Sequence, residues 1–143
     1  MIDEVRKEPC KKVATVSADT KEENGYLVEL FKEGDKTTLY MTVALPGAFK
    51  GYHLHRIRRG RMICLRGKVK FTVVEGTKKV EQILDAAVPE RLFLPKDVYI
   101  GIENIGDEEA WLINFPDPAY DPAIKDEQLE KTPAEIEEQL KGR

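Results

Sequence analysis

Short segments with strand-like alternation, separated by turn residues, dominate the chain and favour an all-β fold. Val69, Phe71 and Val73, for example, would lie on one face of a strand, with lysines and a threonine on the other face. Breaks rich in glycine, proline and aspartate separate the segments. The expected strands cover residues 12–17, 26–32, 38–44, 51–57, 62–66, 68–75, 79–84, 91–94, 99–104 and 109–115. Many short strands without helical periodicity predict a sandwich or a barrel.

The end of the chain has a different pattern. Thr132 precedes a proline and is followed three residues later by Glu135, which is the arrangement of a helix capping box. Ile136 and Leu140 are four residues apart and would share one face of the helix. The sequence therefore predicts a short C-terminal helix over about residues 132–141.

Between the strands and this helix, residues 116–122 contain three prolines and should form a stiff, extended linker. The whole chain has 143 residues, a length typical of one domain. We therefore expect a single domain over residues 1–143, with the barrel at about 12–115.

Charge and composition exclude several classes of protein. Lysine and arginine number 23 against 26 acidic residues, so the net charge is −3, which disfavours a dedicated nucleic-acid binder. The start is charged rather than apolar, and no run is long enough to cross a membrane. Cys10 lies in a polar stretch and Cys64 in an apolar one, so we expect reduced thiols and a cytoplasmic protein.

The only two histidines of the chain lie two positions apart, at His53 and His55. Within a strand both imidazoles would point to the same face, toward whatever space that strand lines. This pair is the main candidate for chemistry. A role as ordinary barrel-lining residues remains open.

The residues around this pair resemble the cupin superfamily. Gly47, His53, His55 and Gly67 have the spacing of its first motif, although Arg59 or Gly60 stands where that motif has a glutamate. A second motif matches in spacing at residues 95–104, but there Ile100 replaces the histidine. The resemblance implies a jelly-roll barrel. Because two of the usual metal ligands are absent, we expect no metal, and binding by the two histidines with distant carboxylates is the alternative.

A narrower resemblance links the chain to dTDP-4-dehydrorhamnose 3,5-epimerases. It rests on Lys50-Gly51-Tyr52-His53, on the apolar strand over residues 62–69 that contains Arg66-Gly67, and on Tyr120-Asp121-Pro122. These matches fall between about residues 45 and 122. The resemblance implies an enzyme without a cofactor that removes a proton next to the ketone of a nucleotide-linked 4-keto-6-deoxy sugar and returns one to the opposite face.

The roles implied by this resemblance can be assigned residue by residue. His53 matches the base, and Tyr120 matches the tyrosine that donates a proton, although a simple rim aromatic remains an alternative for Tyr120. Lys50 stands where the family has an arginine that contacts the diphosphate. The family's lysine has no counterpart, and Arg59 or Arg61 would replace its charge. Glu103, Asp117 and Asp121 are the candidates for the carboxylate that orients the base.

A neighbouring group, the dTDP-4-keto-6-deoxyglucose 3,4-ketoisomerases, is also similar. Its Gly-x-His-Ala-His segment resembles Gly51-Tyr52-His53-Leu54-His55, and it gives the second histidine a place in catalysis. Both groups imply a nucleotide-diphosphate sugar as ligand, a homodimer, and proton transfer next to a ketone. A different class, a non-catalytic cupin that binds a small ligand, is the remaining alternative.

Seven cations lie within residues 56–70 without an acidic residue between them. A solvated strand face with its loop, a clamp for a diphosphate and an RNA-binding surface are the three interpretations of this basic stretch. The lack of interleaved aromatic residues disfavours RNA.

Overall fold

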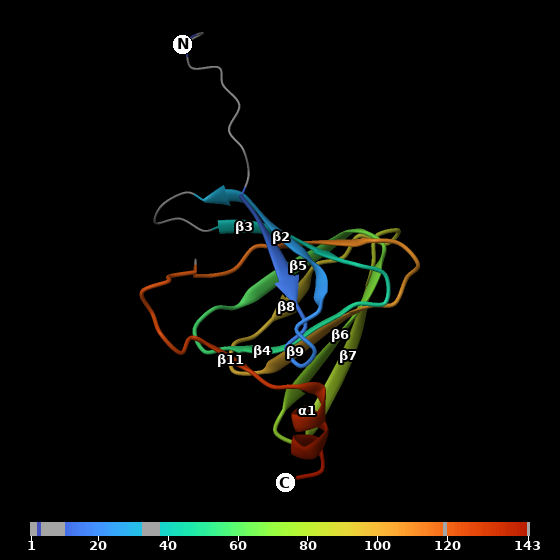
Figure 1. The fold of residues 1–143 in the computed structure, drawn as a ribbon, viewed down its shortest axis with the longest axis vertical. Coiled ribbons are helices and arrows are strands. Elements are labelled where there is room, and N and C mark those ends of the chain that lie inside the picture. Colours follow the sequence, from blue (N-terminus) through green and yellow to red (C-terminus); the bar gives the residue numbers. More distant parts are fainter. Residues whose placement is uncertain (1–2, 4–10, 33–37, 119, 143) are drawn as a thin grey trace.

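The computed structural model describes residues 3, 11–32, 38–118 and 120–142, which form two antiparallel sheets and one helix (Figure 1). The described elements are β1 (Lys11–Val16), β2 (Glu23–Lys32), β3 (Thr38–Ala44), β4 (Phe49–His55), β5 (Gly60–Arg66), β6 (Lys68–Glu75), β7 (Lys78–Asp85), β8 (Leu92–Leu94), β9 (Tyr99–Asn104), β10 (Ala110–Asn114), β11 (Gln128–Glu130) and α1 (Pro133–Leu140). The expected all-β class with a short C-terminal helix is confirmed. Cys10 lies outside the described residues.

The two sheets face each other, and the hydrophobic core lies between them. One sheet has the order β1-β2-β3-β10-β5-β8 and the other has the order β11-β4-β9-β6-β7. Alternate residues of the strands point inward, as the sequence predicts for Val69 and Phe71, which are fully buried with Leu112 from the opposite sheet. Cys64 is a buried free thiol in the same core.

A buried asparagine links the strands at one end of the sandwich. The side-chain nitrogen of Asn104 lies 3.1 Å from the carbonyl oxygen of Ala44, 3.1 Å from that of Leu45 and 2.7 Å from that of Glu108. Its oxygen accepts a hydrogen bond from the amide of Gly106 at 3.0 Å. A buried amide with all its groups paired stabilises one arrangement of the surrounding loops.

The pairing of β4 with β9 is irregular at Gly51, and this irregularity decides which side chains of β4 point inward. Lys50 pairs with Ile102 and His53 pairs with Ile100, so two residues of β4 face one residue of β9. Two residues opposite one residue is the defining feature of a β-bulge. The extra residue reverses the face to which the side chains after it point. Without it, Lys50 and His53 would lie on opposite faces. With it, Lys50, His53 and His55 line the same cavity.

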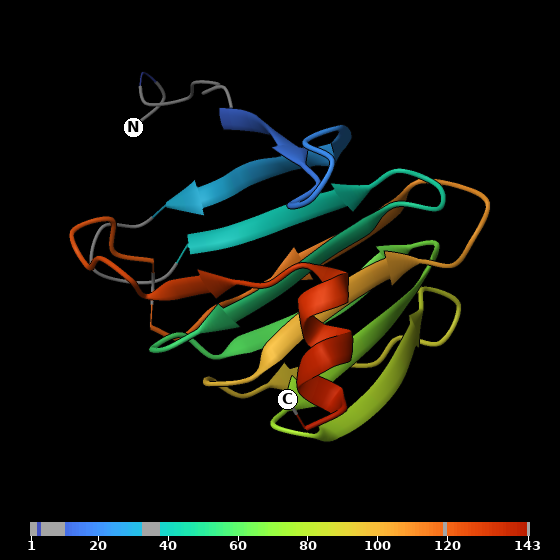
Figure 2. The same cartoon turned by 60° about the horizontal axis from the view of Figure 1, so that its bottom comes forward.

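The segment after the proline-rich stretch returns to the sheet as β11, which the sequence did not predict. Figure 2 shows this strand beside β4, just before the helix. Gln128 pairs with His55 and Glu130 pairs with His53. β11 is short, and all three of its side chains are exposed, so it has no alternating pattern to detect.

The helix α1 follows directly and has the predicted capping box. The amide of Glu135 donates to the hydroxyl of Thr132 at 3.2 Å, and the amide of Thr132 donates to the carboxylate of Glu135 at 3.1 Å. Ile136 is the buried contact of the helix, at 2% exposure. In the described part of the chain, no helix is long and apolar enough to cross a membrane.

Gly51 should tolerate no side chain. Its φ is +136°, and an added Cβ would lie 2.7 Å from the carbonyl oxygen of Ile100 and 2.9 Å from the Cα of Gly101. We expect Gly51→Ala to lower the free energy of unfolding by roughly 3 kcal/mol, as measured by urea denaturation.

Gly47→Ala is the matched control. Gly47 also has a positive φ, of +73°, but nothing lies within 4 Å of an added Cβ. Only backbone strain should act there, with a loss of about 1 kcal/mol. Equal losses in the two variants would contradict the close approach of β4 to β9.

Candidate functional site

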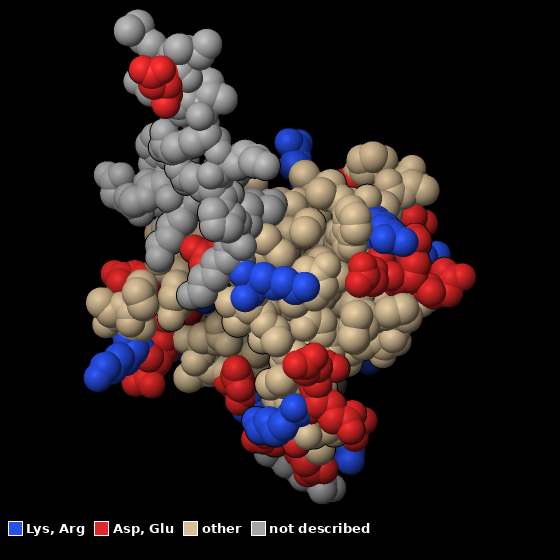
Figure 3. All heavy atoms as spheres, turned by 45° about the horizontal axis from the view of Figure 1, so that its top comes forward, with Lys and Arg blue, Asp and Glu red and all other residues tan. Residues whose placement is uncertain are grey.

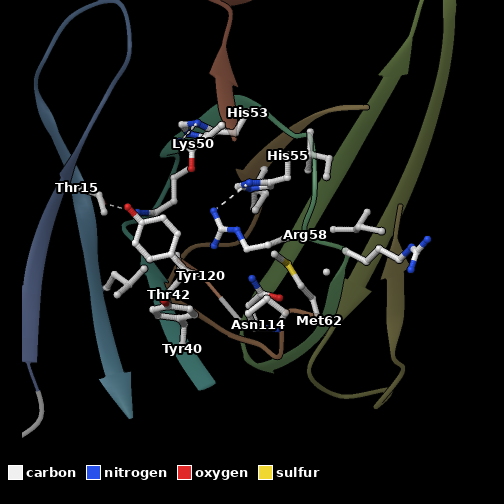
Figure 4. Close-up of a pocket in the computed structure, with 18 of the residues that line it drawn as sticks. Thr15, Tyr40, Thr42, Lys50, His53, His55, Arg58, Met62, Asn114 and Tyr120 are labelled. Carbon is white, nitrogen blue, oxygen red and sulfur yellow. Dashed lines mark hydrogen bonds between the residues drawn. The ribbon is translucent and has the colours of Figure 1, made fainter. Parts of the chain in front are cut away.

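A cavity of about 440 Å³ opens between the two sheets, and it contains most of the residues that the sequence indicated. β4 contributes Lys50, His53 and His55, and the loop that follows contributes Arg58 and Arg59. The opposite sheet and the 116–122 segment complete the wall with Thr15, Asn24, Tyr40, Thr42, Met62, Asn114 and Tyr120. Figure 4 shows the side chains of both histidines, Lys50, Arg58 and Tyr120 converging on this space.

His55 belongs to a network built around a buried carboxylate. Glu127, only 6% exposed, lies just before β11, and its Oε2 is 3.2 Å from Nδ1 of His55. Arg58 donates from Nε to Oε1 of Glu127 at 2.9 Å and from its backbone amide to the same oxygen at 3.2 Å. Nη2 of Arg58 lies 3.1 Å from Nδ1 of His55. These contacts hold the imidazole of His55 in one orientation.

His53 has different partners, both on β11. Its Nδ1 lies 3.0 Å from Nε2 of Gln128 and 3.4 Å from Oε1 of Glu130. The amide nitrogen of Gln128 can only donate, so its contact forms when Nδ1 is unprotonated, whereas the contact with Glu130 forms when Nδ1 carries the proton. In this second tautomer Nε2 has a free lone pair. The ring can therefore accept a proton from a molecule in the cavity.

Both imidazoles are neutral at pH 7. Burial lowers the pKa of His53 below 6.5, and Lys50 lowers it further, while Glu130 acts in the opposite direction. Burial and Arg58 lower the pKa of His55, against the opposing effect of Glu127. Burial alone would raise the pKa of Glu127, but its hydrogen bonds to Arg58 and His55 lower the pKa overall, so this carboxylate stays ionised.

Lys50 is a buried amine in the wall of the cavity, at 8% exposure. Its Nζ donates to the hydroxyl of Thr15 and lies 3.4 Å from Oδ1 of Asn24. Burial lowers the pKa of this lysine from 10.5 to about 8.

Tyr120 lies at the margin of the cavity and is 47% exposed. The guanidinium of Arg58 lies over its ring, 4.8 Å from the centroid, in a cation–π contact. Tyr40 is a second phenol in the wall, and burial raises its pKa. Arg58 therefore contacts both the histidine network and the tyrosine that the sequence indicated.

The structure brings Lys50, His53, His55, Arg59 and Tyr120 to one cavity, but Arg61 lies elsewhere. Arg61 lines a smaller depression on the outer side of its sheet. There its Nε donates to the carbonyl of Phe115 at 3.1 Å and its guanidinium lies over the Phe115 ring. Alternation along β5 explains this position, since Met62 points inward.

The carboxylates that contact the histidines are also different from those considered in the sequence. Glu103 lies 3.9 Å from Lys70, and Asp121 accepts a hydrogen bond from the amide of Ala123. Asp117 forms a backbone bridge with Arg59. The contacts to the histidines come from Glu127 and Glu130, in a segment that is far from β4 in sequence and has no strand-like pattern.

The basic stretch is divided among several environments. Arg58 points into the cavity, Arg61 points outward, and Arg66 pairs with Glu108 at 3.2 Å. On the face in Figure 3, basic side chains are scattered, and most of them lie beside acidic ones. Arg58, Arg61 and Arg66 therefore do not form one continuous basic surface.

The residues of the cavity do not fit the metal of a typical cupin. Among the described residues, no group of three or more histidine, cysteine, aspartate or glutamate side chains is arranged to hold an ion. Ile100 pairs with His53, at the position of a further histidine ligand. The guanidinium of Arg58 lies 3.1 Å from His55, and its positive charge would repel a metal ion there.

The sequence of this chain is similar to a known protein family and to a curated protein. Residues 20–128 match the model of the polysaccharide biosynthesis C-terminal domain. A probable low-salt glycan biosynthesis epimerase, Agl13 of Haloferax volcanii, is 28% identical over 127 residues, which cover 79% of this chain and 80% of Agl13.

Solved structures share the fold. The capsular polysaccharide assembling protein CapF of Staphylococcus aureus aligns over 88% of this chain with a TM-score of 0.74 and 20% identity, and this chain spans only 35% of CapF. A dTDP sugar isomerase from Desulfovibrio desulfuricans G20 aligns over 94% of this chain and 89% of its own, with a TM-score of 0.64 and 15% identity. NovW, a 4-keto-6-deoxy sugar epimerase of Streptomyces spheroides, aligns over 90% and 76%, with a TM-score of 0.60 and 16% identity.

These likenesses confirm the cupin fold, which this chain shares with the solved sugar isomerase and epimerase. The family match spans most of the strands that build the cavity, from β2 to the first residue of β11. The chain belongs to the polysaccharide biosynthesis C-terminal domain family.

Proposed function

We propose that the protein is an epimerase of a nucleotide-linked 4-keto-6-deoxy sugar, which removes a proton next to the ketone and returns one without a metal. The observation that carries the proposal is the cavity, in which two neutral imidazoles, a phenol and an amine face the same space. The similarity to Agl13, a probable epimerase, to NovW, a sugar epimerase, and to the dTDP sugar isomerase supports the same class of reaction.

In this proposal His53 is the base. Its pKa is lowered, so the ring is neutral at pH 7, and it acts as a base in the tautomer in which Nδ1 donates to Glu130 and Nε2 is free. Tyr120 is the group that returns a proton, because it reaches the cavity from the 116–122 segment and not from β4. Arg59, at the exposed margin of the cavity, contacts the diphosphate.

His55 acts as a second proton carrier, and Glu127 and Arg58 position it. A neutral imidazole with a buried carboxylate partner also suits the transfer of a proton between two adjacent carbons. The 3,4-ketoisomerase reaction is therefore the second candidate. The two reactions share the first proton abstraction and differ in where the proton returns.

The test is deuterium exchange. The protein is incubated with dTDP-4-keto-6-deoxyglucose in D₂O, and NMR follows the label at C3 and C5. We expect exchange at one or both carbons, and a loss of roughly 10²–10⁴-fold in rate for His53→Asn, since a general base is removed. If the wild-type protein forms a 3-keto product and His55→Asn does not, the protein is a 3,4-ketoisomerase.

Two results would contradict the proposed enzyme activity or the role of His53 in it. Folded wild-type protein that exchanges neither carbon, yet binds the nucleotide sugar, would be a binding module. Exchange that survives in His53→Asn would remove this histidine as the base. The exposed Gln82→Asn, on β7, is the control variant and should exchange at the wild-type rate.

The pH profile gives a further prediction. Because the pKa of His53 is lowered, the midpoint of the acid-side decline in kcat/KM should lie below pH 6.5, the ordinary pKa of histidine, since the base becomes protonated only there. Glu130 raises the pKa of His53, so Glu130→Gln should move the decline to still lower pH.

Glu103→Gln is the matched control for this shift, because Glu103 faces Lys70 and not a histidine. Rates measured between about pH 5 and 8 decide the outcome, since this range spans the ordinary pKa of histidine. If kcat/KM of Glu130→Gln declines at the same pH as that of the wild type, protonation of His53 is not the cause of the decline.

A further inference from the structure

We propose that Lys50 is the catalytic group at the ketone oxygen of the substrate, to which its ammonium donates first a hydrogen bond and then a proton. This inference rests on the proposed function. It gives Lys50 a role in the reaction itself and not the contact with the diphosphate that the sequence resemblance implies.

The geometry shows an amine held in place from the opposite sheet. Nζ of Lys50 donates to Thr15 of β1 and lies 3.4 Å from Oδ1 of Asn24 on β2. The hydroxyl of Thr15 in turn donates to Oδ1 of Asn24 at 2.7 Å, and Nδ2 of Asn24 donates to the carbonyl of Phe49 at 3.0 Å. The amine therefore has a fixed position in the cavity wall.

The ammonium of Lys50 has fewer hydrogen-bond acceptors than donors. An ammonium group has three N–H donors, and two acceptors, Thr15 and Asn24, are present among the described residues. Both are neutral, and no carboxylate of the described residues forms an ion pair with Lys50. A buried cation without a counter-charge favours an anion beside it. In the cavity that anion comes from the ligand.

The charges around the cavity favour a small developing anion at this position. Among the described residues, His53 on the same strand is a titratable group that interacts electrostatically with Lys50, while the contacts of the amine on β1 and β2 are the uncharged Thr15 and Asn24. Arg58 is already paired with Glu127, and Arg59 lies at the exposed margin, where a hydrated diphosphate fits better. Lys50 and His53 are adjacent on the inward face of β4, so the ketone oxygen and the neighbouring C–H can contact them together.

Each bond and proton of this step is accounted for. His53 takes the proton from the carbon next to the ketone, the C–H electron pair forms a C=C bond, and the carbonyl electron pair moves to oxygen. Lys50 transfers a proton to that oxygen and becomes a neutral amine. In the second half of the reaction, the amine takes the O–H proton back, the C=O bond forms again, and the C=C electron pair takes the phenol proton of Tyr120 on the other face of the carbon. The imidazolium of His53 then loses its proton to solvent, and the phenolate of Tyr120 takes one up.

A lysine suits this exchange because it can release its proton, whereas a guanidinium cannot. Burial lowers the pKa of Lys50 to about 8, so the charged and neutral forms are both accessible near neutral pH. The wild-type kcat/KM should therefore decline as pH rises through about 8, when the free enzyme loses the ammonium.

The experiment compares Lys50→Met with Arg59→Gln, by steady-state kinetics, deuterium exchange and calorimetric binding of dTDP. We expect Lys50→Met to lower kcat by roughly 10²–10³-fold, as loss of one oxyanion donor does, while KM and the Kd for dTDP change less than about two-fold. Arg59→Gln should raise KM and the Kd for dTDP and keep kcat. The opposite pattern, with dTDP affinity lost and kcat kept in Lys50→Met, would overturn the proposal.

Lys50→Arg provides a second readout. It keeps the charge but not the transferable proton, so activity should recover only in part and the decline above about pH 8 should vanish. Methionine removes a buried cation, so the thermal midpoint of Lys50→Met at pH 7 should not fall. If that variant does not fold, Lys50→Arg alone decides, and an unchanged decline above about pH 8 overturns the proposal.

Failure of this inference differs from failure of the proposed function. Wild-type protein that exchanges deuterium, with Lys50→Met equally fast, would overturn only the role of Lys50. Wild-type protein that exchanges nothing would overturn the epimerase, and the role of Lys50 with it.

Discussion

The irregular pairing of β4 with β9 is the constraint on which the site depends. A strand with strict alternation would place Lys50 on the face opposite to His53 and His55. The extra residue at Gly51 brings all three side chains to the cavity, and it is possible only because the missing Cβ lets the backbone approach Ile100 and Gly101. A packing feature of the backbone therefore determines which charges the cavity contains.

The charges that enter the cavity are stabilised in two different ways. Arg58 and Glu127 neutralise each other at 2.9 Å, and this pair fixes the orientation of His55 and places a cation over Tyr120. Lys50 has only neutral partners, so its burial is compensated by a lower pKa and not by an ion pair. The first arrangement makes a rigid site, and the second leaves a charge available to a ligand.

Local patterns predicted much of the fold and part of the site. Alternation indicated strands such as residues 68–75, and the residues around Thr132 indicated the capped helix, because both signals come from neighbours in sequence. The same rule predicted a shared face for His53 and His55. It could not place Lys50, whose face depends on a bulge, or Glu127, whose contact with His55 depends on a strand without a pattern.

The same reasoning explains why the arginines of the basic stretch could not be ranked from the sequence. Arg58, Arg59 and Arg61 are close in sequence, yet one is buried against Glu127, one lies at the cavity margin and one points to the outer face. Their roles differ because a cation that is already paired loses most of its attraction for a ligand, whereas an exposed one is weakened by solvent. A buried lysine with neutral partners has neither restriction, so the strongest interaction with a developing negative charge in this cavity is expected at Lys50.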